Sequence, residues 1–152
     1  MKAIGQTDLI GEHGVRKSDL RIRLLGAIDE ASAALSLAKA FCSPENQERI
    51  EICQKNLSRM MGLLAALPKT PLSDYKACFA EELEALEAEN TGIEAGVSYP
   101  EAFIHPGQTP ATGALNLART VVRRAEREAV AAFEALNIPD ESMLQYLNRL
   151  ST

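Results

Sequence analysis

Residues 111–127 read Ala-Thr-Gly-Ala-Leu-Asn-Leu-Ala-Arg-Thr-Val-Val-Arg-Arg-Ala-Glu-Arg, and this stretch decides the fold of the chain. It follows a Pro-Gly turn, and nothing in it breaks a helix after Gly113. Apolar residues recur here at steps of three and four, which predicts a helix with one buried face. The apolar positions are Leu115, Ala118, Val122, Ala125, Ala129 and Phe133.

A second, polar stripe runs beside this apolar face. We call its four residues, Asn116, Arg119, Arg123 and Glu126, the arginine stripe. They lie roughly a third of a turn from the apolar face, so their side chains flank the core. Arginines one turn apart beside a core predict either a bound polyanion or carboxylates of neighbouring helices, because a guanidinium pairs well with both. The residues alone leave both interpretations open.

Four more helices are expected around this one. Each shows an apolar face at helical spacing, and no segment reads as a convincing strand. The pattern predicts an all-α protein, a five-helix antiparallel bundle that forms one domain over residues 1–152. The additional helices are expected over about residues 18–41, 43–68, 74–90 and 139–152.

Two segments fall outside these helices. Residues 1–17 read as an irregular arm interrupted by glycines, which can let backbone amides approach a phosphate, although such a segment is more often simply a loop. Gly92 is expected to end the third helix in a left-handed cap. Residues 92–110 then form the longest unstructured stretch, and long ordered loops are often functional. The glutamates of the third helix are expected to form a solvated face.

The composition restricts the classes of function. A net charge of −5 argues against general nucleic-acid binding, which needs a basic surface. No apolar run is long enough to span a membrane, and residues 1–15 lack a signal-peptide core. Three cysteines without a Cys-x-x-Cys pair predict free thiols in the cytoplasm. The two histidines are far apart, which argues against a dedicated protein metal site.

Asp29 is the notable acidic residue of the first helix. With Ser32 and Ser36 it forms a small polar stripe at the edge of the apolar face. A carboxylate beside a core is costly unless it meets a cation or a donor. Arg119 or Arg123 is the candidate partner, and a simple surface position for Asp29 also remains open.

Three segments together resemble the cobalamin adenosyltransferase family of the PduO type. Phe103-Ile104-His105-Pro106-Gly107 followed by Ala118-Arg119-Thr120-Val121-Val122-Arg123-Arg124-Ala125-Glu126-Arg127 is similar to the family's Phe-Ile-Leu-Pro-Gly-Gly and Ala-Arg-Thr/Ala-Val-x-Arg-Arg-Ala-Glu-Arg. Gly26-Ala27-Ile28-Asp29-Glu30 resembles Gly-Thr-Val-Asp-Glu, and Tyr146-Leu147-Asn148-Arg149-Leu150-Ser151 resembles Tyr-Leu-Asn-Arg-Leu-Ser. Residues 7–19 resemble the family's nucleotide arm, so the resemblance covers nearly the whole chain.

The resemblance implies an ATP:cob(I)alamin adenosyltransferase, a homotrimer with active sites between subunits. Arg123 would contact the ATP triphosphate, with Mg²⁺ on its phosphates, and Arg119 would pair with Asp29 across the interface. Phe103 would press on the lower face of the corrin, beside Ile104. The resemblance further implies a cob(II)alamin reductase and a cobalamin-dependent enzyme as partners. The implied nucleotide contacts are Gly5, Thr7, Lys17, Arg123, Glu126 and Asn148, and Arg124 would support the site.

Several positions depart from the family pattern and keep an alternative open. Ser32 replaces a family asparagine, and Arg23 replaces a glutamate. The arm begins late in the family pattern, and the last helix ends early at Thr152. These departures motivate a second hypothesis, a non-catalytic member of the same fold that binds corrinoid or nucleotide for regulation or delivery. A bundle with only an assembly role is the third.

Overall fold

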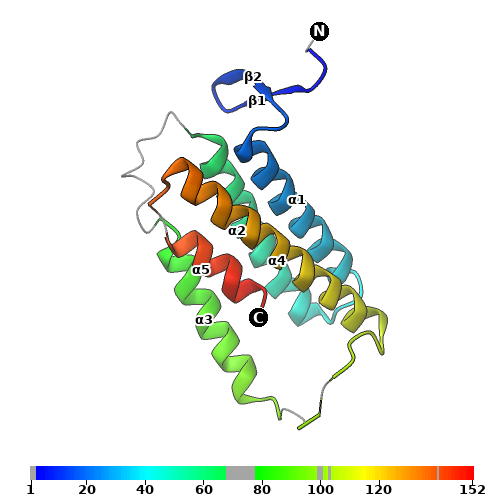
Figure 1. The fold of residues 1–152 in the computed structure, drawn as a ribbon. Coiled ribbons are helices and arrows are strands. Elements are labelled where there is room, and N and C mark those ends of the chain that lie inside the picture. The colour runs from blue at the N-terminus through cyan, green and yellow to red at the C-terminus, as the bar shows by residue number, and fades with distance from the viewer. Residues whose placement is uncertain (1–2, 68–77, 99–100, 103, 140) are drawn as a thin grey trace.

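Five helices and one β-hairpin make up the part of the chain that the structure, a computed structural model, describes (Figure 1). The described residues are 3–67, 78–98, 101–102, 104–139 and 141–152. The elements in chain order are β1 (Gln6–Leu9), β2 (Glu12–Arg16), α1 (Leu20–Lys39), α2 (Pro44–Ala65), α3 (Ala80–Ala95), α4 (Pro110–Leu136) and α5 (Glu141–Leu150).

Successive helices run in opposite directions along the bundle (Figure 1). α1 packs against both α2 and α4, whereas α5 packs against α3 and α4. The arginine-bearing helix α4 is therefore in contact with both α1 and α5. The predicted five-helix antiparallel bundle is confirmed. No helix within the described ranges is long and apolar enough to cross a membrane.

Side chains at the helix starts explain where three helices begin. The Asp19 carboxylate accepts a hydrogen bond from the Arg21 amide at the start of α1; from the sequence either Ser18 or Asp19 could cap this helix. Ser43 caps α2 in the same way, with Pro44 in the first turn. Thr109 and Thr112 form a reciprocal capping box at the start of α4. Each cap satisfies backbone N–H groups that the first turn would otherwise leave without a partner.

The core follows the predicted apolar faces closely. In α4 the predicted positions Ala118, Val122, Ala125, Ala129 and Phe133 are buried, and Val121 and Ala132 join them. Leu115 was expected to be inward but is 37% exposed, because the buried face of α4 continues toward its start through Ala114, which packs against the core, and Leu115 lies to one side of it. Tyr146 of α5 is buried against Phe79, with their rings edge to face and their centroids 5.1 Å apart.

Two predictions about the connecting segments were wrong. The arm at residues 1–17 contains an antiparallel hairpin, β1 paired with β2, in place of a wholly irregular stretch. Gly92 does not end the third helix, because α3 continues to Ala95 and Gly96 caps it with a right-handed φ of −93°. The loop before α4 therefore starts at Gly96, not at residue 92.

The acidic face of α3 is not only solvated, as the sequence had suggested. Glu82 pairs with Arg59 of α2, and Glu89 pairs with Arg49 of α2. Glu87 lies 3.8 Å from Arg149 of α5. α3 has no fully buried residue, so these ion pairs supplement limited apolar packing in holding α3 to its neighbours.

Asn137 ends α4 in the left-handed conformation, with φ 53° and ψ 42°, and its N–H bonds back to the helix. We expect Asn137→Ala to lower the free energy of unfolding by about 1 kcal/mol, because a residue with a Cβ is strained there unless it can bond locally. Asn137→Gly should be neutral or slightly stabilising. Urea unfolding of the three proteins checks this, and equal stability of the alanine and glycine variants would contradict it.

Candidate functional site

A groove lies beneath the hairpin, between it and the first two helices. Its volume is about 490 Å³. Thr7 and Leu9 line it from β1, Gly26 and Asp29 from α1, and Gly62 from α2. The two glycines leave room between the helices, and Asp29 places a carboxylate at the wall. Thr7 and Asp29, two residues singled out from the sequence, thus share one cavity.

Gly5 and Lys17 lie together at the base of the hairpin. The Lys17 amide donates to the Gly5 carbonyl at 2.8 Å, which joins the two ends of the arm. Gly5 has φ 81°, a conformation that favours glycine. At the other side of the hairpin the Gly14 amide donates to the Asp8 carboxylate at 3.1 Å. The tertiary structure therefore gathers Gly5, Thr7 and Lys17 in one small element beside Asp29.

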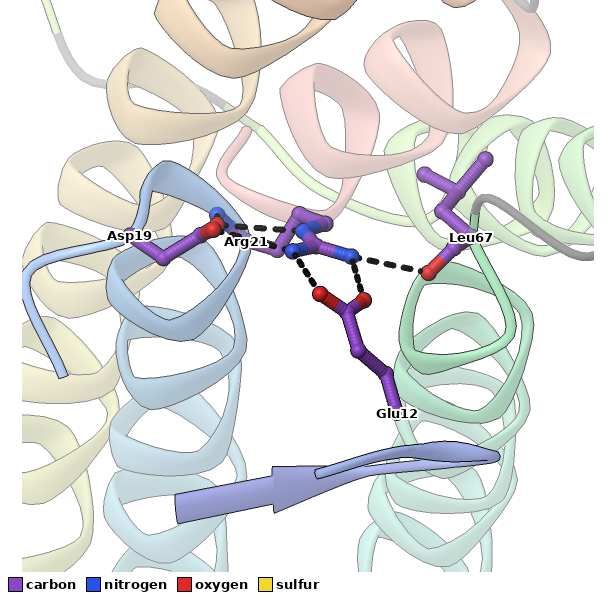
Figure 2. A network of polar contacts seen from close by, with 4 residues as sticks. All are labelled: Glu12, Asp19, Arg21 and Leu67. Atoms are coloured by element: carbon purple, nitrogen blue, oxygen red, sulfur yellow. Dashed lines mark hydrogen bonds and ion pairs between the residues drawn. The ribbon is translucent and has the colours of Figure 1, made fainter. Parts of the chain in front are cut away.

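Arg21 connects this hairpin to the helices (Figure 2). Its guanidinium donates to Glu12 of β2 at 2.7 Å, to Asp19 at 2.9 Å and to the carbonyl of Leu67 at 3.0 Å. The hydrogen bonds from Arg21 hold the pKa values of Glu12 and Asp19 below their ordinary range, and the two carboxylates raise the pKa of Arg21. Sequence reasoning missed this cluster, since nothing in the sequence pairs Glu12 with Arg21.

These lowered pKa values predict an acid-dependent loss of stability. Their contribution to the free energy of unfolding is fully present above the ordinary carboxyl values near about pH 4, and it is lost as pH falls through the lowered values. We expect the stability difference between the natural protein and Glu12→Gln to be constant above about pH 5 and to shrink as the pH falls from about 5 toward about 2. Urea titrations at several pH values measure it, and a constant difference would contradict the expectation.

The arginine stripe lies along one flank of α4, with Arg119 and Arg123 exposed and Asn116 and Glu126 half-buried. Arg119 donates to its neighbour Asn116 at 3.0 Å, and Arg123 has no side-chain partner among the described residues. Glu126 accepts a hydrogen bond from the Asn148 carboxamide of α5 at 2.8 Å. Glu126 and Asn148 line an open cleft of about 290 Å³ between α3, α4 and α5. The stripe therefore presents an unneutralised guanidinium near a polar cleft.

Within one chain, Asp29 and the arginine stripe face different neighbours. Gln54 of α2 bonds the Ser32 carbonyl and the Ser36 hydroxyl, which share a flank of α1 with Asp29. The stripe faces α5 instead, as the bond between Glu126 and Asn148 shows. The side of α4 that meets α1 carries Arg124, which pairs with Glu30. An ion pair of Asp29 with Arg119 or Arg123 inside one chain, which the sequence had left open, is therefore absent from the described residues.

The predicted corrin contacts are placed only in part. Phe103 lies outside the described residues. Ile104 follows it in the loop before α4, and 58% of its surface is exposed. An exposed isoleucine beside the start of α4 leaves an apolar side chain available to a ligand.

Comparisons with known proteins agree on one family. A sequence model of the cobalamin adenosyltransferase family matches residues 3–152. The corrinoid adenosyltransferase of Bacillus subtilis is 36% identical over 153 residues, which cover 97% of this chain and 76% of that protein. The corrinoid adenosyltransferase PduO of Salmonella typhimurium is 34% identical over 148 residues. This chain spans less than half of that relative, 44% of its length.

Solved structures show the same fold. One is an arginine-to-lysine variant of a PduO-type ATP:corrinoid adenosyltransferase from Lactobacillus reuteri complexed with ATP; its TM-score is 0.81 at 30% identity, over 97% of this chain and 83% of that one. A phenylalanine-to-alanine variant of the enzyme from the same organism, complexed with cobalamin and ATP, has a TM-score of 0.83 at 29% identity, over 97% and 82% of the two chains.

Proposed function

The chain belongs to the cobalamin adenosyltransferase family, and on that premise we propose that it transfers the 5′-deoxyadenosyl group of ATP to cob(I)alamin. The products are adenosylcobalamin and triphosphate. The observation that carries the proposal is the exposed Arg123 guanidinium, which has no side-chain partner among the described residues. An arginine in that state is suited to a triphosphate, because its planar fork donates two parallel hydrogen bonds to phosphate oxygens.

The nucleotide is held at the groove beneath the hairpin. Gly5, Thr7 and Lys17 approach it from the arm, and the groove of about 490 Å³ offers space beside them. Asn148 contributes from the stripe side. Because its amide nitrogen donates to Glu126, its oxygen remains an acceptor, which suits a ribose hydroxyl or the adenine amino group. Glu126 thus orients Asn148 and does not itself meet the phosphates, which its negative charge would repel.

The site is shared between copies of the chain, as a homotrimer. The groove with Asp29 and the flank with Arg119 and Arg123 face different neighbours within one chain, so one copy does not bring them together. A second copy that presents its arginine stripe to the groove would pair Arg119 with Asp29 and carry Arg123 to the phosphates. This arrangement also supplies the cation that the Asp29 carboxylate lacks among the described residues.

The reaction asks the protein for position and charge, not for a nucleophile. The electron pair of Co(I) forms a bond to the 5′ carbon of ATP while the bond from that carbon to the triphosphate oxygen breaks. Negative charge then builds on the leaving triphosphate, where a nearby guanidinium stabilises it. Phe103 and Ile104 contribute apolar contacts to the corrin from the loop before α4, and the exposed Ile104 is consistent with that role.

Mg²⁺ enters with the nucleotide. No cluster of three or more histidine, cysteine or acidic side chains suited to a metal occurs in the part of the chain that the structure describes. Magnesium in nucleotide sites takes most of its ligands from phosphates and water, with one or two carboxylates at most. Asp29 and Asp8 at the groove are the carboxylates within reach of such an ion. The residues therefore fit Mg²⁺ carried by ATP.

The protein works in the reducing cytoplasm, with a cob(II)alamin reductase to supply Co(I) and a cobalamin-dependent enzyme to receive the product. The three cysteines, Cys42, Cys53 and Cys78, are free thiols, which is consistent with that compartment.

A direct assay tests the proposed function. The protein is mixed with ATP, Mg²⁺ and cob(I)alamin generated by a chemical reductant, and the light-sensitive cobalt–carbon product is followed by its absorbance. We expect formation of adenosylcobalamin that depends on both ATP and protein. Corrinoid binding with no ATP-dependent product would replace the proposal with the second candidate, a corrinoid-binding protein for regulation or delivery. Normal turnover would eliminate that candidate.

A further inference from the structure

We propose that Arg21 is a positioning residue that fixes the shape of the groove beneath the hairpin. Three elements form the walls of this groove: the hairpin, α1 and α2. Arg21 belongs to α1, and its guanidinium bonds both other walls, through Glu12 of the hairpin and the Leu67 carbonyl beyond α2. One side chain therefore sets how the three walls stand relative to one another. Its role toward a ligand rests on the proposed nucleotide site.

The contacts of Arg21 with Glu12, Asp19 and the Leu67 carbonyl, which we call the clamp, have a geometry suited to holding these groups rigidly. The guanidinium contacts both oxygens of Glu12, at 2.7 and 3.4 Å, and both oxygens of Asp19, at 3.1 and 2.9 Å (Figure 2). Only 12% of its side chain is exposed. A planar fork with five donors fits such a set of acceptors, whereas the single ammonium of lysine does not reach all of them.

The hairpin depends on this contact because it has little apolar area of its own. Between residues 3 and 17, Val15 is the only fully buried residue. Two strands of four and five residues are marginal without further packing. A charge-assisted contact to a largely buried arginine is therefore a main anchor of the hairpin on the bundle.

The contact to Leu67 anchors the second wall. Leu67 lies just past the C-terminal end of α2, where backbone carbonyls have no partner within the helix. A cation at this end of a helix is also favoured by the helix dipole. The same guanidinium that holds the hairpin thus holds the end of α2, close to Ala65, which lines the groove.

Loosening the clamp would lower the fraction of molecules whose groove is ready for a nucleotide, and the apparent affinity falls by that fraction. We use Glu12→Ala, because Arg21→Ala would also remove the Asp19 and Leu67 contacts. For Glu12→Ala we expect the KM for ATP to rise by about tenfold and kcat to change by less than about twofold. The KM for the corrinoid should stay unchanged. Glu12→Gln, which keeps an acceptor oxygen, should restore part of the affinity.

A matched control is the exposed pair of Glu45 and Arg49, at 2.8 Å in the first turns of α2. Glu45→Ala removes an arginine–glutamate contact of the same kind away from the groove and should leave the KM for ATP unchanged. A merely structural role for Arg21 would lower the melting temperature of Glu12→Ala without a selective change in the KM for ATP. That result, at temperatures where both proteins are folded, would overturn the proposal.

Hydrogen exchange without any ligand separates this proposal from the proposed function. In Glu12→Ala the amides of the hairpin, including that of Lys17, should exchange at least about tenfold faster than in the natural protein, while those in the middle of α1 do not change. If the natural protein neither binds nor uses ATP, the proposed function fails. Hydrogen exchange of the hairpin amides then tests by itself whether Arg21 holds the hairpin in place. Unchanged hairpin exchange in Glu12→Ala would then overturn it.

Discussion

Arg123→Ala is expected to lower kcat/KM for ATP by about 100- to 1,000-fold, the usual loss when one donor to developing charge is removed. The physical reason is that Arg123 offers an unneutralised guanidinium where the triphosphate is proposed to leave. Stability should change by no more than about 0.5 kcal/mol, because the exposed side chain has no partner to lose among the described residues. The variant should therefore lower kcat/KM while leaving the free energy of unfolding nearly unchanged.

Steady-state kinetics with varied ATP and saturating cob(I)alamin measure this effect, and circular dichroism checks the fold. Arg123→Lys keeps the charge but loses the fork, so it should bind ATP and turn over more slowly. Arg49→Ala is the control, since it removes an arginine of α2 that pairs with Glu45 and Glu89, outside the proposed site. Natural kinetics in Arg123→Ala would contradict a role of Arg123 at the triphosphate and would favour the hypothesis of a bundle with only an assembly role.

Reversing either charge of the proposed pair between copies, Asp29→Arg or Arg119→Asp, is expected to dissociate the trimer and remove most activity. A close charge pair across an interface costs about 2–5 kcal/mol when one partner is lost, and a like charge adds repulsion. Since each trimer would contain three such pairs, the effect on assembly multiplies. The double variant should recover the trimer, because it restores one positive and one negative charge at the same contact.

Analytical ultracentrifugation of the four proteins tests this pairing, with activity measured on the same samples. The control is the exchange of Glu51 and Lys55, an exposed pair within α2 at 2.9 Å, which should leave the mass unchanged. Trimers in both single variants would show that Asp29 and Arg119 do not meet. If all three variants lose the trimer and its activity, including the double variant, Asp29 and Arg119 each have another, independent role.

Strong local signals explain why the helices could be predicted. The faces of α1, α2 and α4 repeat their apolar residues over several turns, and Asp19 and Ser43 are typical helix caps. α3 was predicted less well, because Gly92 reads as a helix end from sequence. The helix α3 nevertheless continues past Gly92 to Ala95. A glycine inside a helix costs only about 1 kcal/mol relative to alanine, so it does not have to end the helix.

The hairpin could not be predicted, for a physical reason. Its strands are short, and three glycines with positive φ, Gly5, Gly11 and Gly14, interrupt the pattern. What anchors it is a clamp whose members are far apart in sequence: Arg21 meets Glu12 nine positions away and Leu67 at a distance of 46 positions. No local pattern contains such a contact, because it exists only once α1 and α2 have packed.

The sequence by itself determined the phase of each helix. A fixed rotation per residue places Arg119, Arg123 and Glu126 on one flank of α4, and Asp29 with the serines on one flank of α1. Only the tertiary structure decided which neighbour each flank faces: α2 beside Asp29, and α5 beside the arginine stripe. Helix phase follows from backbone geometry, whereas the order of helices around the core follows from long-range packing. Within one chain, that packing keeps Asp29 and Arg119 from pairing with each other.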